Sequence, residues 1–120
     1  MPVTVLVVDD HPSFRRNARR MLEAAGYAVV DEAADGTSAL AAARATRPDV
    51  VLLDVLLPDT TGFEVAAALA SESAPPVVVL TSSRNEADFG GAVRQSRASG
   101  FIAKRDLTAA ALTAVVRGAA

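Results

Sequence analysis

The sequence predicts a doubly wound α/β fold, a five-stranded parallel sheet with helices on both faces, within one domain. Three observations support this fold class. Five short apolar runs rich in β-branched residues alternate with segments whose apolar residues recur at helical spacing. The runs lack polar alternation, which is typical of parallel strands buried on both faces. The chain has 120 residues, of which 51% are hydrophobic, and this suffices for one packed core.

The strands are predicted where Val, Leu and Ile gather along the chain. They are residues 5–8, 27–33, 50–53, 77–80 and 100–103. The first and third runs end abruptly in acids, and a proline and a glycine soon follow the third. These runs are therefore expected to deliver polar groups at their carboxyl ends.

The helices are predicted where apolar residues recur every three or four positions. They are residues 12–25, 36–46, 63–70, 85–97 and 107–118. Gly26 ends the first helix, and Pro75 and Pro76 follow the third, because Gly and Pro terminate helices. The fourth contains Gly90 and Gly91, and each Gly costs about 1 kcal/mol relative to Ala in a helix interior. We expect that helix to be labile.

The composition excludes several classes of protein. Without Cys there is neither a disulfide framework nor a thiolate metal site. The net charge of -2 gives no general attraction to nucleic acid, so any DNA contact is expected from another segment. No apolar run approaches membrane-spanning length, and residues 1–4 do not resemble a signal peptide. We expect a cytoplasmic location and no membrane partner.

Asp54 is the residue that most needs a functional explanation, because it directly follows an apolar strand. Burying it unpaired would cost several kcal/mol, so it is expected to point from the strand end into a polar pocket. The alternative is an N-cap of the next helix, a common use of Asp. Asp59, Thr60 and Thr61 lie closer to that helix, and we assign the capping role to one of these three.

Polar side chains gather at the carboxyl ends of the predicted strands. They are Asp9 and Asp10 after the first, Asp54 after the third, Thr81 and Ser82 after the fourth, and Lys104 after the fifth. Ligands of doubly wound sheets bind at this edge. Three carboxylates repel one another there, so a hard divalent cation, Mg²⁺, is expected. Lys104 is the only lysine, and its ammonium suits a single phosphoryl oxygen. The set predicts a carboxylate that accepts a phosphoryl group.

With these residues placed, the whole chain resembles the receiver domains of two-component response regulators, which have the CheY-like fold. The motifs that carry the resemblance are Val7-Val8-Asp9-Asp10-His11-Pro12, Leu52-Leu53-Asp54-Val55-Leu56-Leu57-Pro58 with Gly62, Leu80-Thr81-Ser82, and Gly100-Phe101-Ile102-Ala103-Lys104. The resemblance implies a flavodoxin-like sheet with strand order 2-1-3-4-5.

The resemblance also implies a role for each carboxylate. Asp54 is the phospho-acceptor. Mg²⁺ is bound directly by Asp10, Asp54 and the backbone carbonyl of Leu56, and Asp9 acts through water. The domain would phosphorylate and dephosphorylate itself without being an enzyme.

The switch residues are likewise implied by the resemblance. Thr81 and Lys104 contact the phosphoryl group, and the ring of Phe101 changes rotamer when Thr81 is pulled in. The fourth helix, the fifth strand and the last helix would form the signalling face.

The first and last motifs look like the NarL/LuxR-type branch, whose members usually carry a C-terminal helix-turn-helix domain. The implied partners are a sensor histidine kinase, a second copy of the chain after phosphorylation, and DNA only through a domain beyond residue 120. We expect the kinase to dock at the arginine-bearing first helix, beside the loop after Lys104. A stand-alone CheY-like receiver that acts by protein–protein interaction stays open as an alternative.

Two departures from the family pattern matter. Arg105 follows Lys104 where many receivers have Pro, so an ordinary trans bond is expected. The two glycines in the fourth helix lead to a hypothesis that residues 85–97 are partly disordered without phosphate and become ordered on activation.

Three rival functions fit the residues less well. A phosphatase of the haloacid dehalogenase type needs a second Asp two residues beyond the nucleophile, where this chain has Leu56 or His11. A nucleotide-binding module lacks its Gly-rich loop after the first strand. A degenerate receiver used only for protein interaction would normally have lost an acid or the lysine, and neither is missing.

Overall fold

The computed structural model describes residues 2–119, in which five parallel strands form one sheet in the order β2-β1-β3-β4-β5. The strands are β1 (Thr4–Val8), β2 (Ala28–Ala33), β3 (Val50–Asp54), β4 (Val77–Ser82) and β5 (Gly100–Ala103). The helices are α1 (Pro12–Ala24), α2 (Gly36–Thr46), α3 (Gly62–Ala70), α4 (Ala92–Gln95) and α5 (Ala109–Ala119). The predicted fold class and strand order are confirmed. The direction of winding reverses between β1 and β3, where such sheets bind ligands.

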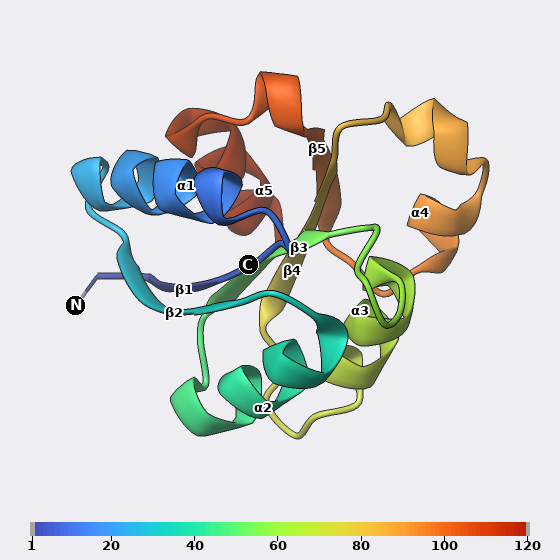
Figure 1. The fold of residues 1–120 in the computed structure, drawn as a ribbon, viewed down its shortest axis with the longest axis horizontal. Helices are drawn as coiled ribbons and strands as arrows, with labels where there is room; N and C mark the ends of the chain where they lie inside the picture. Colours follow the sequence, from blue (N-terminus) through green and yellow to red (C-terminus); the bar gives the residue numbers. More distant parts are fainter. Residues whose placement is uncertain (1, 120) are drawn as a thin grey trace.

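Two layers of helices cover the sheet, because successive side chains of each strand point to opposite faces. Val5 and Val7 pack with α1 and α5, whereas Leu6 and Val8 pack with α2 and α3. Figure 1 shows the same division, with α1 and α5 on one side of the sheet and α2, α3 and α4 on the other. Both faces of the central strands are therefore buried, as the unbroken apolar runs indicated.

The helix caps differ in part from the prediction. Thr61 caps α3 as expected, since its side chain accepts a hydrogen bond from the backbone N–H of Glu64. Asp59, another of the three candidates for this cap, serves a different helix. Its carboxylate accepts hydrogen bonds from the backbone N–H groups of Gly36 at 2.8 Å and Thr37 at 3.1 Å, at the start of α2. The loop after β3 is thus tied to a neighbouring helix.

The predicted fourth helix over residues 85–97 is not continuous. A 3₁₀ turn over Glu86–Phe89 is followed by the single-turn helix α4. Gly90 separates them with φ +59°, a left-handed conformation that cannot continue a right-handed helix. The prediction of one helix is wrong, and the glycine that was expected to weaken it interrupts it.

The peptide bonds of the described residues are all trans, including the bond before Arg105, as expected. Within residues 2–119, no helix has the length and apolar character needed to cross a bilayer.

Candidate functional site

The strand ends bring the predicted site residues together at one edge of the sheet. Asp9 directly follows β1, Asp54 ends β3, and Lys104 follows β5. Asp54 lies in register with Thr81 of β4. Asp9, Asp54 and Thr81 are buried, with 0%, 4% and 0% of their surface exposed. These buried polar groups surround the point where the strand order reverses.

Three carboxylates form the centre of this site. Side-chain ligand atoms of Asp9, Asp10, His11 and Asp54 all lie within 4.8 Å of one another. The set is dominated by hard oxygen donors and carries more negative charge than one lysine neutralises, so it fits a divalent cation such as Mg²⁺. His11 was not predicted as a site residue, although its position next to two acids was a usable signal.

Lys104 supplies the positive charge of the site. Its Nζ lies 2.7 Å from Asp9 Oδ2 and 3.4 Å from Asp54 Oδ2. The same ammonium lies 4.4 Å from the ring centroid of Phe14 in α1, a cation–π contact. The lysine is therefore held beside the carboxylates by contacts on two sides.

Burial and neighbouring charges give the two buried carboxylates opposite protonation behaviour. Burial and, after it, the charge of Asp9 raise the pKa of Asp54 to about 6, against the opposing charge of Lys104. Burial alone would raise the pKa of Asp9 as well, but hydrogen bonds from Lys104 and His11 outweigh it and lower that pKa. Burial would lower the pKa of Lys104, yet Asp9 and Asp54 raise it. Asp9 and Lys104 thus stay charged. Of the two buried carboxylates, Asp54 is the one whose negative charge is less well compensated by its neighbours.

The Thr81 hydroxyl is buried without a hydrogen-bond partner. An unpaired buried hydroxyl is costly, so one at a ligand-binding edge suggests an incoming acceptor. Ser82, its neighbour, has its Oγ engaged by the backbone N–H of Arg84 at 3.1 Å. Of the two predicted hydroxyls, Thr81 is the one that makes no hydrogen bond.

Leu56 and Phe101 occupy the two sides of this edge. The backbone N–H of Leu56 donates to Asp54 Oδ1 at 3.4 Å, which places this loop beside the carboxylate. On the other side, the Phe101 ring lies 6.0 Å from that of Phe89 in the 3₁₀ turn, and Phe89 lies 5.7 Å from Phe63 of α3. These aromatic contacts join β5 to α3 through the 3₁₀ turn Glu86–Phe89.

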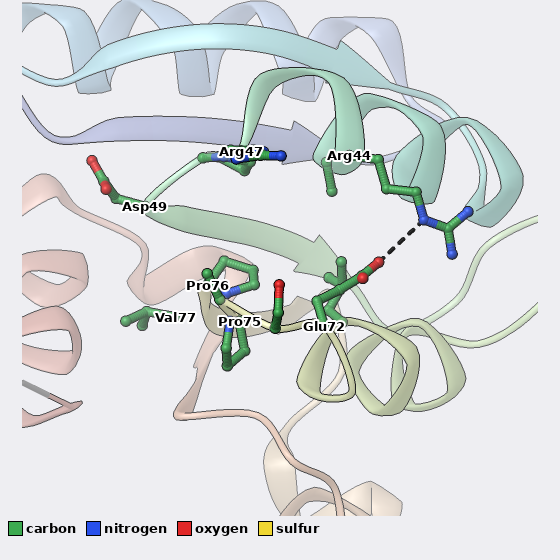
Figure 2. A pocket seen from close by; sticks show the side chains of 12 residues that line it. Arg44, Arg47, Asp49, Glu72, Pro75, Pro76 and Val77 are labelled. Atoms are coloured by element: carbon green, nitrogen blue, oxygen red, sulfur yellow. Dashed lines mark hydrogen bonds and ion pairs between the residues drawn. The ribbon is translucent and has the colours of Figure 1, made fainter.

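A separate hollow of about 470 Å³ lies at the other end of the sheet. It is lined by Asp49 and Val77, which are next to or at the amino ends of β3 and β4, and none of the predicted site residues reaches it. Figure 2 shows the Arg44–Glu72 ion pair on its wall, with a separation of 3.1 Å. This hollow is not part of the carboxylate site.

Nearly the whole chain is similar to known proteins. Residues 5–117 match the family model described as "Response regulator receiver domain". A curated relative of Mycobacterium tuberculosis, "Probable transcriptional regulatory protein NarL", is 43% identical over 103 residues, covering 85% of this chain and 48% of that protein. The solved signal receiver domain of NarL from that organism aligns over 98% of both chains, with 38% identity and a TM-score of 0.88.

The curated relatives are not all named as transcriptional regulators. A protein-glutamate methylesterase/protein-glutamine glutaminase of Anaeromyxobacter dehalogenans is 44% identical over 87 residues, which are 72% of this chain and 26% of that protein. The chain spans no more than about half the length of the curated relatives it matches.

Proposed function

Because the chain belongs to the response regulator receiver family of two-component systems, we propose that Asp54 accepts a phosphoryl group from a sensor histidine kinase in a Mg²⁺-dependent reaction. The observation that carries this proposal is the Asp54 carboxylate itself. It is buried at a strand end, it has a raised pKa, it lies beside Lys104, and it is in register with Thr81, whose hydroxyl has no partner.

In the proposed reaction, an oxygen of Asp54 attacks the phosphorus of the donor. The bond between oxygen and phosphorus forms as the bond from phosphorus to the donor nitrogen breaks, and the leaving imidazole takes up a proton. At pH values above about 6, the pKa of Asp54, its carboxylate is ionised, and only the ionised carboxylate is a nucleophile. A bound Mg²⁺ would neutralise charge on the phosphoryl oxygens and orient them.

The surrounding residues would hold the cation and contact the phosphoryl group. Asp10 and Asp54, with the Leu56 carbonyl, would hold the cation directly, and Asp9 would act through water while it keeps Lys104 charged. Lys104 would contact one phosphoryl oxygen from its position beside Asp54. The Thr81 hydroxyl would donate to another, which would give that buried group its missing partner.

The proposed output is a change on the face formed by α4, β5 and α5. Movement of Thr81 toward the phosphoryl group would make room for Phe101 to turn inward, and Phe101 contacts Phe89. Residues 85–97 would then become more ordered. The relatives named as transcriptional regulators support transcription control as the output. We propose that this control acts through a helix-turn-helix domain beyond residue 120 and through a homodimer formed on phosphorylation.

The chemical proposal is tested by incubating the domain with Mg²⁺ and a small phosphodonor and measuring its intact mass. One added phosphoryl group is expected, and EDTA should prevent it. The Asp54→Asn variant should gain nothing, whereas Asp59→Asn, a control that removes a carboxylate outside the cluster, should still be phosphorylated. Phosphorylation that persists in Asp54→Asn would exclude Asp54 as the acceptor.

The proposed ordering is tested by amide hydrogen exchange over residues 85–97, with and without a phosphate mimic. Increased protection with the mimic is expected, because the single-turn α4 and the 3₁₀ turn bury little surface alone. Strong protection that is the same in both states would contradict the ordering, but not the phosphorylation itself.

A further inference from the structure

The only histidine of the chain faces the carboxylate cluster. His11 Nδ1 lies 3.0 Å from Asp9 Oδ1 and 3.1 Å from Asp10 Oδ1. Bonds of about 2.1 Å to one cation place neighbouring ligand atoms about 3.0 Å apart in octahedral and about 3.4 Å apart in tetrahedral geometry. The imidazole nitrogen thus lies from each of the two oxygens at a distance that suits two ligands of one ion as well as a hydrogen bond.

The orientation of the His11 ring is not explained by the helix that it precedes. His11 is the N-cap residue of α1, and its side chain makes no capping hydrogen bond. Its ring is turned toward the acids, and its side chain is 66% exposed, so an ion can reach Nδ1 without rearrangement of the core.

We propose that His11 Nδ1 is a metal ligand, so that the cluster is a mixed nitrogen–oxygen site that binds Zn²⁺ in competition with Mg²⁺. Imidazole is a favourable ligand for Zn²⁺ and its transition-metal neighbours, whereas Mg²⁺ prefers oxygen ligands and retains water. Asp9, Asp10 and Asp54 supply the oxygens, and the four side chains provide the number of protein donors usual for Zn²⁺. This inference rests on the proposed cation site and extends it to a second class of metal.

The test uses tag-free protein near neutral pH, with its single histidine labelled with ¹⁵N. Addition of Zn²⁺ should shift the Nδ1 resonance until one equivalent is bound, and Mg²⁺ alone should leave that resonance near its starting position. Mg²⁺ in excess should weaken the apparent Zn²⁺ affinity, because both ions use the same carboxylates. With only one histidine, no assignment of the signal is needed.

The matched variant is His11→Asn, whose amide can still donate a hydrogen bond to Asp9 but offers no imidazole nitrogen. Calorimetry should show that Zn²⁺ binds this variant about 10- to 100-fold more weakly. Its Mg²⁺ affinity should stay close to that of the wild type. Thermal unfolding without metal checks that the variant is folded.

The inference is overturned if Zn²⁺ leaves Nδ1 unshifted, or if His11→Asn binds Zn²⁺ as tightly as the wild type. Either result would assign His11 only as a hydrogen-bond donor to Asp9. These measurements use no phosphodonor, so they separate the two proposals. Phosphorylation of Asp54 without any His11 effect would remove only the zinc inference, and a His11 effect without phosphorylation would remove only the phosphoryl-transfer proposal.

Discussion

Replacement of Asp54 by Asn should stabilise the metal-free domain at neutral pH while it abolishes phosphorylation. The ionised carboxylate is buried beside Asp9, and Lys104 only partly compensates its charge. The pKa of Asp54 is about 6 in the folded chain against 3.8 for an unperturbed Asp, a difference that corresponds to about 3 kcal/mol at pH values above both. The neutral amide of Asn avoids this cost.

The pH dependence has a definite sign. Between 3.8 and about 6 the folded protein keeps the Asp54 proton that the unfolded chain has lost, so folding binds protons. The contribution of Asp54 to stability therefore decreases as pH rises through this window and is lowest above about 6. The advantage of Asp54→Asn should be about 10 °C in melting temperature at neutral pH and should vanish below pH 4.

Circular dichroism melts in EDTA provide the assay, and Mg²⁺ provides an internal check. At a hundred times its dissociation constant, Mg²⁺ should stabilise the wild type by about 2.7 kcal/mol and close most of the gap, while Asp54→Asn should gain less. Asp59→Asn is the matched control. Amides of Gly36 and Thr37 lower the pKa of Asp59, so this change should destabilise the protein. An Asp54→Asn variant no more stable than the wild type in EDTA would refute the reasoning.

Three further substitutions test other parts of the site. Thr81→Val should leave the melting temperature unchanged or slightly higher, because the buried hydroxyl has no partner, yet it should abolish phosphate-dependent protection in hydrogen exchange. Lys104→Met should cost about 3 kcal/mol in urea unfolding, because it leaves the buried charge of Asp9 without its cation. Gly62→Ala should cost about 1 to 3 kcal/mol and slow phosphorylation, because the new Cβ would lie 2.5 Å from the backbone oxygen of Asp54.

The control for the glycine change is Gly118→Ala in α5. No atom lies within 4 Å of the Cβ position there, so the variant should be neutral or slightly stabilised by its higher helix propensity. Equal melting temperatures for Gly62→Ala and Gly118→Ala would show that the close approach at Asp54 is easily relaxed.

Much of the fold and of the carboxylate site could be predicted because local signals agreed with the tertiary structure. Apolar runs gave the strands, and the rule that ligands bind at carboxyl ends placed Asp9, Asp54, Thr81 and Lys104 at one edge. That reasoning needed only strand direction, because parallel strands all end on the same side.

The features that could not be predicted depended on contacts between distant segments. Asp59 lies two residues before Thr61, and only the packed position of α2 shows that it serves that helix. Gly90 could be expected to weaken a helix, but its positive φ, and the contacts of the neighbouring Phe89 ring with two rings of distant segments, could not be predicted from local sequence. The contacts of the His11 ring with Asp9 and Asp10 depended on the rotamer of His11, which spacing along the chain does not determine.

The hydrogen bonds between Asp59 and α2 hold the loop on one side of Asp54 more firmly than the segment on its other side is held. The loop after β3 is tied to α2 by Asp59, and the hydrogen bond from the Gly62 N–H to the Val55 carbonyl at 2.6 Å joins its two ends. On the β4 and β5 side, the nearest cover is the interrupted segment before α4. We therefore expect a change at Asp54 to move residues 85–97 more readily than the tethered loop after β3.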